Sequence, residues 1–344
     1  MADPAILVAP AILEDWGADI LTRAGAAADH ARLAAAALVR ADLRGIATHG
    51  VTRLPVYCDQ LLDGRLNPAA AIAIAWRGDA LVVEGDRALG PAAMRAAAEQ
   101  LYPRARERGI ATAFLHGVGH LGAIGLFALE AAEAGLVMLL CQQTPPLMAL
   151  EGSSAPLLGN NPIAFAAPVA GGPPLLFDTA LSVAARGRIL AAVRDGTPAI
   201  PGDWAIDAEG RPTTDPAAAL AGSLLPIAGY KGMGFAMLVQ LLAGTLTGTS
   251  LGEHAPSGAP PGVGAFALVI APEVLLGPGV AEAELAGWLD RVKTADPDGR
   301  YPGMRGAEIE RRRRVEGIAL PPAVVDQLRA SATKVGAAIP PAIR

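Results

Sequence analysis

The sequence predicts an α/β fold in which a mixed-sheet core is joined to a helical domain formed by both ends of the chain. Apolar residues recur at helical spacing near the N-terminus. Short apolar runs then alternate with helical segments, and helical spacing returns after residue 280. We therefore expect a discontinuous helical domain of residues 1–70 and 285–344 around an α/β domain of residues 71–284.

The N-terminal part is predicted to be entirely helical. The spacing of apolar residues indicates two helices between Ile12 and Leu43, and a third from Val51 to Leu62. The glycine and proline within residues 63–68 then end the third helix.

The middle of the chain alternates predicted strands and helices. Residues 77–79 are a hairpin signal, Gly90-Pro91 opens a long helix, and Gly109 closes it. We expect strands at 71–75, 80–84, 110–115, 136–141, 163–167, 175–178 and 264–270, and helices at 90–108, 123–134, 184–192, 233–246, 281–292 and 321–331.

Composition limits the class of protein. The chain has 344 residues, a net charge of −5 and a hydrophobic fraction of 52%, which suits a globular protein and argues against nucleic acid as a partner. The basic run 311–314 lies among glutamates, so we expect a solvated helix face there. The longest apolar stretch, 233–246, is too short for a membrane span. The two cysteines are far apart in sequence, which favours a reducing, cytoplasmic location. The first apolar residues have no basic flank before them, so they do not resemble a signal peptide.

Residues 42–57 concentrate polar groups that carry chemistry. His49 and Arg53 are four residues apart, so a helix starting near Gly50 would point both side chains toward one small substrate. A guanidinium holds a carboxylate by two hydrogen bonds, and an imidazole exchanges a proton near neutral pH. This pairing suits a reaction at the carbon beside a carboxylate. The alternative is that Arg44 and Arg53 are solvated and His49 merely begins a helix.

The glycine-rich segment 117–122 matches GxGxxG between a predicted strand and a predicted helix. However, the next strand ends at Gln142-Gln143, where a ribose-binding acid would be needed, so we disfavour a classical Rossmann site. His116 and His120 are separated by residues that form a poor helix, and no third ligand is evident. We therefore predict no metal site.

Two further turns carry polar side chains. Asn160 and Asn161 precede a proline and a strand, where they either contact a ligand or cap the loop. Lys231 lies among glycines at the head of an apolar helix, which favours an anion. A capped helix with a snorkelling lysine explains the same pattern.

Together these segments resemble the malate/L-lactate dehydrogenase family of NAD(P)-dependent oxidoreductases, which includes ureidoglycolate, sulfolactate and diketogulonate enzymes and cyclic ketimine reductases. The resemblance covers nearly the whole chain. The family motifs RGxxSHGxxRL, HFGA, GTNPIA, DxATSxxAxGK, WAxDxxGxPTTDP and KGxGL are matched, in order, by residues 44–54, 120–123, 159–164, 178–188, 204–216 and 231–235.

The resemblance implies a non-Rossmann nicotinamide-binding fold that binds NAD or NADP, assembled as a homodimer with the cofactor near the partner subunit. His49 is the implied acid/base, with Thr48 beside it, while Arg53 and Asn160 bind the substrate. The implied cofactor contacts are His120, Leu121, Gly122, Ala123, Ile124, Asp178, Thr179, Ala180, Tyr230, Lys231, Gly303 and Arg305.

Four residues depart from the family pattern: Thr48 replaces a serine, Leu121 a phenylalanine, Asn160 a threonine and Met304 an acid. The last two change the hydrogen bonding or charge at expected contacts. We expect hydride transfer at the carbon adjacent to a carboxylate, interconverting 2-oxo and 2-hydroxy acids. Reduction of cyclic ketimines such as piperideine- or pyrroline-2-carboxylate is the alternative. A ligand-binding relative without turnover is disfavoured because His49 and Arg53 are both present.

Overall fold

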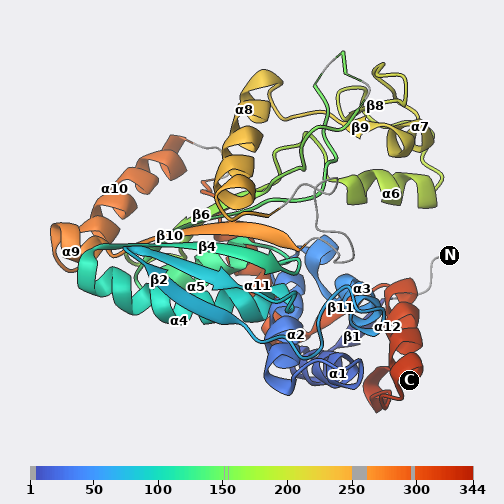
Figure 1. Cartoon of the computed structure of the whole chain (residues 1–344), viewed down its shortest axis with the longest axis horizontal. Helices are drawn as coiled ribbons and strands as arrows, with labels where there is room; N and C mark the ends of the chain where they lie inside the picture. Colours follow the sequence, from blue (N-terminus) through green and yellow to red (C-terminus); the bar gives the residue numbers. More distant parts are fainter. Residues whose placement is uncertain (1–4, 151, 154, 250–261, 296–298, 344) are drawn as a thin grey trace.

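A seven-stranded mixed sheet forms the centre of the computed structural model, which describes residues 5–150, 152–153, 155–249, 262–295 and 299–343 (Figure 1). Its strands β3 and β4 are parallel, and every other neighbouring pair is antiparallel. The predicted mixed α/β core is confirmed. In spatial order the strands are β2 (Ala73–Arg77), β3 (Ala80–Glu84), β4 (Ile110–Val118), β10 (Val263–Ile270), β5 (Val137–Gln142), β6 (Ile163–Ala167) and β7 (Leu175–Thr179).

The first hairpin is shifted from its predicted position. Arg77 is the last residue of β2 and pairs with Ala80, so the turn has only two residues. Gly78 adopts a φ of 61°, which a two-residue hairpin turn requires and glycine accepts without steric cost. The strand therefore begins two residues later than the apolar pattern indicated.

Helices α4 (Gly90–Arg108) and α5 (Gly125–Glu133) cover one face of the sheet (Figure 1). Their inner surfaces are built from alanines such as Ala93, Ala97 and Ala128, which are fully buried. Small side chains let each helix approach the strands closely, and the resulting contacts stabilise the layer by dispersion and by burial of apolar surface.

The opposite face carries α8 (Tyr230–Val239), which continues into a π-helical turn at Gln240–Thr245 that packs on β10. Beside it in Figure 1 lie α6 (Arg186–Arg194), α7 (Pro216–Ala221) and the two-residue strands β8 (Ala205–Ile206) and β9 (Ser223–Leu224). The sequence did not indicate α7, β8 or β9, which are too short to show a period. None of the helices in the described ranges is long and apolar enough to cross a membrane.

Both ends of the chain contribute to a second hydrophobic cluster. It joins α1 (Pro10–Arg23), α2 (Ala28–Leu43) and α3 (Leu54–Leu62) to α12 (Pro322–Val335). Strand β1 (Ile6–Val8) pairs with β11 (Ile318–Leu320), which the sequence analysis missed. Two helices, α9 (Pro272–Leu276) and α10 (Val280–Ala295), project from the far end of the sheet (Figure 1). The boundaries at residues 70 and 285 stay a prediction.

Helix α11 (Met304–Glu316) carries the basic run 311–314, in which Arg311, Arg312 and Arg314 are exposed as expected and Arg313 is half-buried. One face of this helix packs on α2, where Glu310 is 8% exposed and Arg44 is 6% exposed. Arg44 Nη1 donates to Glu310 Oε2 at 2.8 Å, and Arg44 Nη2 donates to the Gly303 carbonyl at 3.2 Å. Arg44 is therefore neither solvated nor free for substrate, because its guanidinium ties α2 to α11.

Replacing Glu310 with glutamine should destabilise the protein. Glu310→Gln leaves the buried Arg44 guanidinium without its counter-charge, and breaking a buried pair in this way costs ~3–5 kcal/mol. The matched control is Glu316→Gln on the same helix, because Glu316 and Arg312 form an exposed pair at 3.7 Å. We expect the control to change the free energy of unfolding by less than ~0.5 kcal/mol. Equal effects in denaturant titrations would contradict this account.

Candidate active site

The segment that carries His49 and Arg53 is organised by the carboxylate of Asp42. This side chain is buried, and its Oδ2 accepts a hydrogen bond from the Val51 N–H at 2.7 Å. Burial raises the pKa of Asp42 to about 6, against the lowering effect of the Val51 N–H and of Arg313. A Cβ added at Gly50 would lie 2.1 Å from Asp42 Oδ1, so only glycine fits there. The carboxylate therefore sets the path of the chain between residues 47 and 53.

Two short 3₁₀ turns result, Ala47–His49 and Val51–Arg53, on either side of Gly50. The α-helix expected from residue 51 consequently begins at Leu54. The sequence pattern did not reveal this because apolar spacing does not distinguish a 3₁₀ turn from the first turn of an α-helix.

His49 and Arg53 are joined through Thr48. The Thr48 hydroxyl lies 3.0 Å from His49 Nδ1, and Arg53 Nε donates to the Thr48 carbonyl at 2.8 Å. Within the described part of the chain, the terminal nitrogens of Arg53 have no protein partner. One guanidinium edge is thus fixed while the remaining N–H groups are available to a carboxylate.

A second imidazole, that of His120, lies against the first. The ring centroids of His49 and His120 are 5.7 Å apart, and the Tyr57 hydroxyl lies 2.9 Å from His120 Nδ1. Tyr57, on α3, is a polar neighbour of the candidate site that the sequence analysis missed. It follows Arg53 by four residues, so the spacing used for His49 and Arg53 could have identified it.

Burial keeps both imidazoles neutral at pH 7. Desolvation, and then the nearby charge of Arg53, lowers the pKa of His49 to about 4. Desolvation, His49 and Arg53 lower the pKa of His120 to about 3. A carboxylate bound to Arg53 would offset its charge and raise the pKa of His49. Binding of an acid at Arg53 would therefore increase the fraction of His49 that is protonated at a given pH.

The glycines of segment 117–122 serve close packing between chain segments. A Cβ at Gly119 would lie 2.7 Å from the Ala88 carbonyl, and a Cβ at Gly90 would lie 2.4 Å from the His120 carbonyl. Gln142, at the position expected for a ribose-binding acid, instead braces the turn. Its Oε1 accepts from the Leu121 N–H at 3.2 Å, and its Nε2 donates to the Gly119 carbonyl at 3.3 Å.

The first group of predicted cofactor residues comes together at the start of α5. Asp178 Oδ2 accepts from the Gly125 N–H at 2.8 Å, which places Asp178–Ala180 beside the segment His120–Ile124. Burial raises the pKa of Asp178 to about 6, partly offset by that N–H. The side chains of Leu121 and Ile124 are buried in the core, so only their backbone could face a cofactor. Within the same group, Gly122 has a φ of 80°, Ala123 is buried and the Thr179 hydroxyl donates to the Ala180 carbonyl.

The other predicted contacts lie on separate elements. Tyr230 and Lys231 are exposed in the first turn of α8, which begins before the residue 233 that the sequence indicated. Arg305 is exposed on α11, after Gly303 with its φ of 107°. In the part of the chain that the structure describes, no hydrogen bond or ion pair joins these four residues to His49.

The two asparagines of the Asn160-Asn161 turn have different surroundings. Asn160 Oδ1 accepts from the Thr144 hydroxyl at 2.9 Å, and Asn160 is half-buried. Asn161 is fully buried with a φ of 30°, and its Nδ2 donates to the Ala236 carbonyl at 3.0 Å. Asn161 therefore holds the turn against α8, while Asn160 remains the candidate for substrate.

The donor set fits a nicotinamide dinucleotide. Lys231 and Arg305 are exposed cations without a carboxylate partner among the described residues, and α8 presents its first N–H groups beside Lys231. Such groups match the charge of a pyrophosphate.

No cluster of three or more His, Cys, Asp or Glu side chains suited to a metal occurs in the part of the chain that the structure describes. His116 instead pairs with Glu84 at 3.0 Å.

The pKa of His49 should lie well below 6.5 in the free protein. Because folding lowers this pKa to about 4, the stability that His49 contributes is present above pH 6.5 and is lost as the pH falls toward 4. NMR titration of the five histidines, with His49→Gln for assignment, measures the value. Arg53→Gln should raise it. A pKa at or above 6.5 would contradict the buried, cation-flanked environment.

The chain is similar to known proteins over most of its length. The family model described as malate/L-lactate dehydrogenase matches residues 8–329. The chain is 38% identical to a (2R)-3-sulfolactate dehydrogenase (NADP(+)) of Chromohalobacter salexigens, over 88% of this chain and 91% of that protein. It is 36% identical to a Delta(1)-pyrroline-2-carboxylate reductase of Ancylobacter novellus, over 91% and 93%. The crystal structure of a delta1-piperideine-2-carboxylate reductase from Pseudomonas syringae superposes with a TM-score of 0.87 at 30% identity, covering 95% of this chain and 99% of that one. The chain belongs to the malate/L-lactate dehydrogenase family.

Proposed function

We propose that the protein is an NAD(P)-dependent oxidoreductase that transfers a hydride to or from the carbon adjacent to a carboxylate. The observation that carries this proposal is the pairing of a half-buried imidazole with a guanidinium whose terminal N–H groups are free in the described structure. Relatives named for sulfolactate and for pyrroline-2-carboxylate share a carboxylate next to the reacting carbon, which supports this substrate class.

Each residue of the central segment has a distinct role in this proposal. Arg53 holds the substrate carboxylate by two parallel hydrogen bonds, and His49 exchanges the proton on the neighbouring oxygen or nitrogen. The Thr48 hydroxyl can donate to or accept from His49 Nδ1, so the same contact serves both protonation states. The nicotinamide, when bound, supplies or accepts the hydride. We assign Asn160 to the substrate and the groups near His120, Asp178, Lys231 and Arg305 to the cofactor.

Two substrate classes meet the same requirements. A 2-oxo acid presents a C=O group and a cyclic ketimine a C=N group, and both need one carboxylate clamp and one proton source. We place 2-oxo and 2-hydroxy acids first. Ketimine reduction is the second candidate because the relatives include reductases of pyrroline- and piperideine-2-carboxylate.

A panel of 2-oxo acids and cyclic imines, assayed with NADH and with NADPH by loss of absorbance, tests the proposal. We expect turnover of at least one member, and His49→Ala should lower kcat for it by ~10²-fold or more while cofactor affinity changes little. Near-normal kcat in the folded variant would remove His49 as the proton donor. No turnover across the panel would contradict the proposed activity itself.

The carboxylate clamp is tested by Arg53→Lys. Lysine keeps the charge but loses the planar fork, so KM should rise strongly, by ~10-fold or more, with a smaller change in kcat. The methyl ester of a good substrate should be a poor substrate of the unmodified enzyme. Equal rates for the acid and the ester would show that the carboxylate is bound elsewhere.

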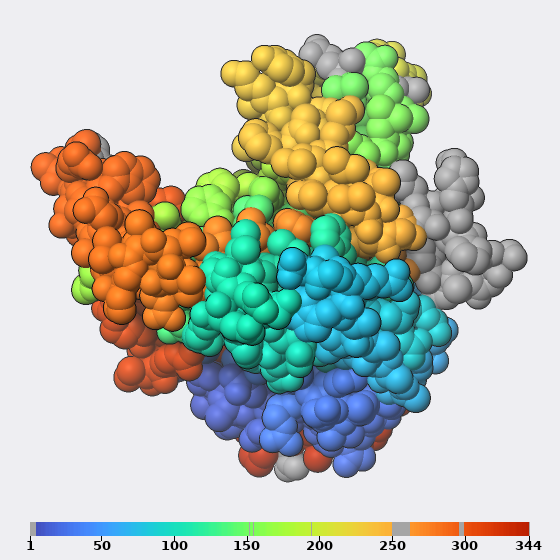
Figure 2. Space-filling model, turned by 60° about the vertical axis from the view of Figure 1, so that its left-hand side comes forward, coloured from blue at the N-terminus to red at the C-terminus, as the bar shows by residue number. Residues whose placement is uncertain are grey.

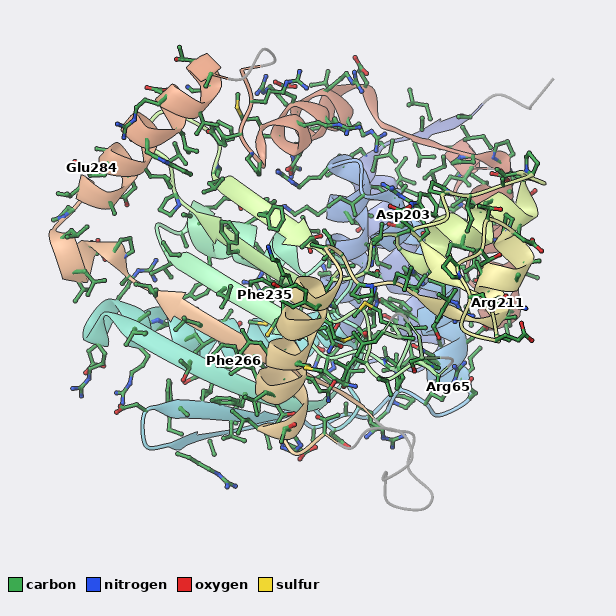
Figure 3. The ribbon with its side chains drawn as sticks, turned by 90° about the horizontal axis from the view of Figure 1, so that it is seen from above. Arg65, Asp203, Arg211, Phe235, Phe266 and Glu284 are labelled. Carbon is green, nitrogen blue, oxygen red and sulfur yellow. The ribbon has the colours of Figure 1, made fainter. Side chains whose placement is uncertain are left out.

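We further propose a homodimer, because two projecting elements expose large apolar side chains. Figure 2 shows the α9–α10 projection and the α8 projection standing away from the rest of the molecule, and Figure 3 shows Phe235 on α8 and Glu284 on α10. Large apolar side chains that are exposed on projecting elements are typical of subunit interfaces. The exposed residues are Phe235, Met237, Leu238, Leu241, Leu246, Val274, Leu275, Leu276 and Trp288.

In this dimer, the partner completes the cofactor pocket beside His120 and Asp178. Light scattering at micromolar concentration should therefore give twice the chain mass, and Phe235→Glu, which charges the interface, should weaken both dimerisation and cofactor binding. A monomer that binds NADH or NADPH tightly would contradict the arrangement.

We also propose a cytoplasmic location, in keeping with the free buried thiols of Cys58 and Cys141.

A further inference from the structure

Asn160 lies at the end of the sheet where several strands meet the candidate site. Strands β4, β5 and β7 all run toward this end, and β6, which is antiparallel to β5 and β7, begins there. His120 follows β4, Thr144 follows β5, Thr179 ends β7, and Asn160 precedes β6. Ligands of α/β proteins bind outside the carboxyl ends of such strands. The segments that carry these residues therefore surround one site.

Backbone contacts hold Asn160 between two parts of this site. The Pro162 carbonyl accepts from the Gln142 N–H at 3.2 Å, and the Gln142 side chain braces the turn that carries His120. On the other side, the Leu181 N–H donates to the Asn160 carbonyl at 2.8 Å, directly after the segment at the end of β7 that we assign to the cofactor. Asn160 is thus placed between the imidazole segment and the cofactor segment.

The amide of Asn160 has a defined orientation. Thr144 Oγ1 accepts from the Asn161 N–H at 3.3 Å and lies 2.9 Å from Asn160 Oδ1, to which it donates its single hydroxyl proton. The other acceptor for this proton, Asn161 Oδ1, is 3.4 Å away and already accepts from the Thr144 N–H at 3.0 Å. Turning the amide of Asn160 over would leave the hydroxyl with only this longer contact. The Asn160 oxygen is therefore occupied, while its NH₂ group has no partner among the described residues.

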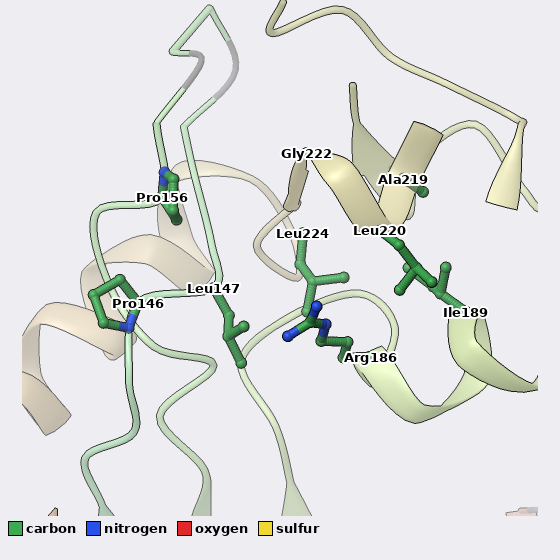
Figure 4. A pocket seen from close by; sticks show the side chains of 9 residues that line it. All are labelled: Pro146, Leu147, Pro156, Arg186, Ile189, Ala219, Leu220, Gly222 and Leu224. Atoms are coloured by element: carbon green, nitrogen blue, oxygen red, sulfur yellow. The ribbon is translucent and has the colours of Figure 1, made fainter. Parts of the chain in front are cut away.

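Backbone pairing also fixes Thr144 beside the Asn160 turn. Beyond Thr144, the chain runs next to the segment that returns to Asn160, and the Leu147 N–H donates to the Leu158 carbonyl at 2.8 Å. Figure 4 shows Leu147 on one of these segments and Pro156 on the other. The relative position of the hydroxyl and the amide is thus set by the backbone.

We propose that Thr144 orients the Asn160 amide so that it donates to the oxygen on the reacting carbon, and that this pair selects 2-oxo acids over cyclic ketimines. This inference rests on the proposed function and decides between its two substrate classes. A carbonyl oxygen has two lone pairs, so it accepts from both His49 and Asn160. Negative charge that develops on this oxygen is stabilised by the oriented N–H group.

A cyclic ketimine lacks the second acceptor. Its nitrogen has one lone pair, which the proton from His49 takes up, and the resulting N–H group then faces the N–H groups of Asn160. A threonine, which the family pattern has at this position, both donates and accepts, so it serves either substrate class. Asn160 replaces that residue with donors alone, because Thr144 occupies its oxygen.

Asn160→Asp is the main test. Aspartate has the shape of asparagine and keeps an acceptor for Thr144, but it presents an oxygen where the NH₂ group was. The probes are pyruvate, oxaloacetate and 2-oxopentanoate, together with pyrroline-2-carboxylate, which has as many carbon atoms as 2-oxopentanoate. We expect the unmodified enzyme to have a higher kcat/KM for at least one 2-oxo acid than for the ketimine. In Asn160→Asp, kcat for that acid should fall ~10²-fold or more, and the kcat/KM ratio of ketimine to acid should rise.

Three further variants separate the contact from a loss of folding. Asn160→Thr should raise the ratio of ketimine to acid ~10-fold, with a smaller loss of activity toward the acid. Thr144→Val removes the hydroxyl that orients the amide and should reduce the preference for the acid by ~3-fold to 10-fold. Thr144→Ser keeps the hydroxyl and should retain the preference. Partial unfolding lowers both activities together, so the ratio reports on the contact itself.

Three results would each overturn the inference: a wild-type preference for the ketimine, equal losses for both classes in Asn160→Asp, or an unchanged preference in Thr144→Val. Equal losses would place the amide on the carboxylate that both classes share. All three leave the proposed hydride transfer standing. Failure of the proposed function would instead appear as no turnover of any probe, and this inference would fall with it.

Discussion

The candidate active site depends on one buried carboxylate. Asp42 lies in the last turn of α2. Its carboxylate accepts the Val51 N–H, and its carbonyl accepts a hydrogen bond from Arg313 on α11. These contacts hold the two 3₁₀ turns that present Thr48, His49 and Arg53. Burial of Asp42 is unfavourable for its charged form, as its raised pKa shows. Helices from both ends of the chain therefore hold the site, and the burial of the Asp42 carboxylate that this requires is locally destabilising.

The same burial determines the protonation of the site. His49 and His120 are neutral in the free protein because desolvation and Arg53 both disfavour the charged imidazole. A bound carboxylate removes part of that effect by pairing with Arg53. An anion held by the Arg53 guanidinium thus raises the fraction of protonated His49.

The sequence predicted long elements well and short contacts poorly. Helix α4 matched its predicted bounds because proline near its start and Gly109 at its end are strong local signals. Strands β1 and β11 have three residues each and pair across almost the whole chain, so no local pattern could reveal them. For the site, His49, Arg53 and His120 came from motifs, and the spacing of Tyr57 from Arg53 was a usable signal. The pairing of Arg44 with Glu310 emerged only from the fold. The difference is physical, since burial and long-range pairing depend on tertiary structure.

The most direct test of this account is a crystal structure of the protein with nicotinamide cofactor and oxamate, an unreactive analogue of a 2-oxo acid. We expect the oxamate carboxylate to accept two hydrogen bonds from the Arg53 guanidinium, and its amide oxygen to lie within about 3.2 Å of the His49 ring. The nicotinamide should face the same carbon. Oxamate bound away from Arg53, or a His49 ring turned from the ligand and the nicotinamide, would contradict the central claim.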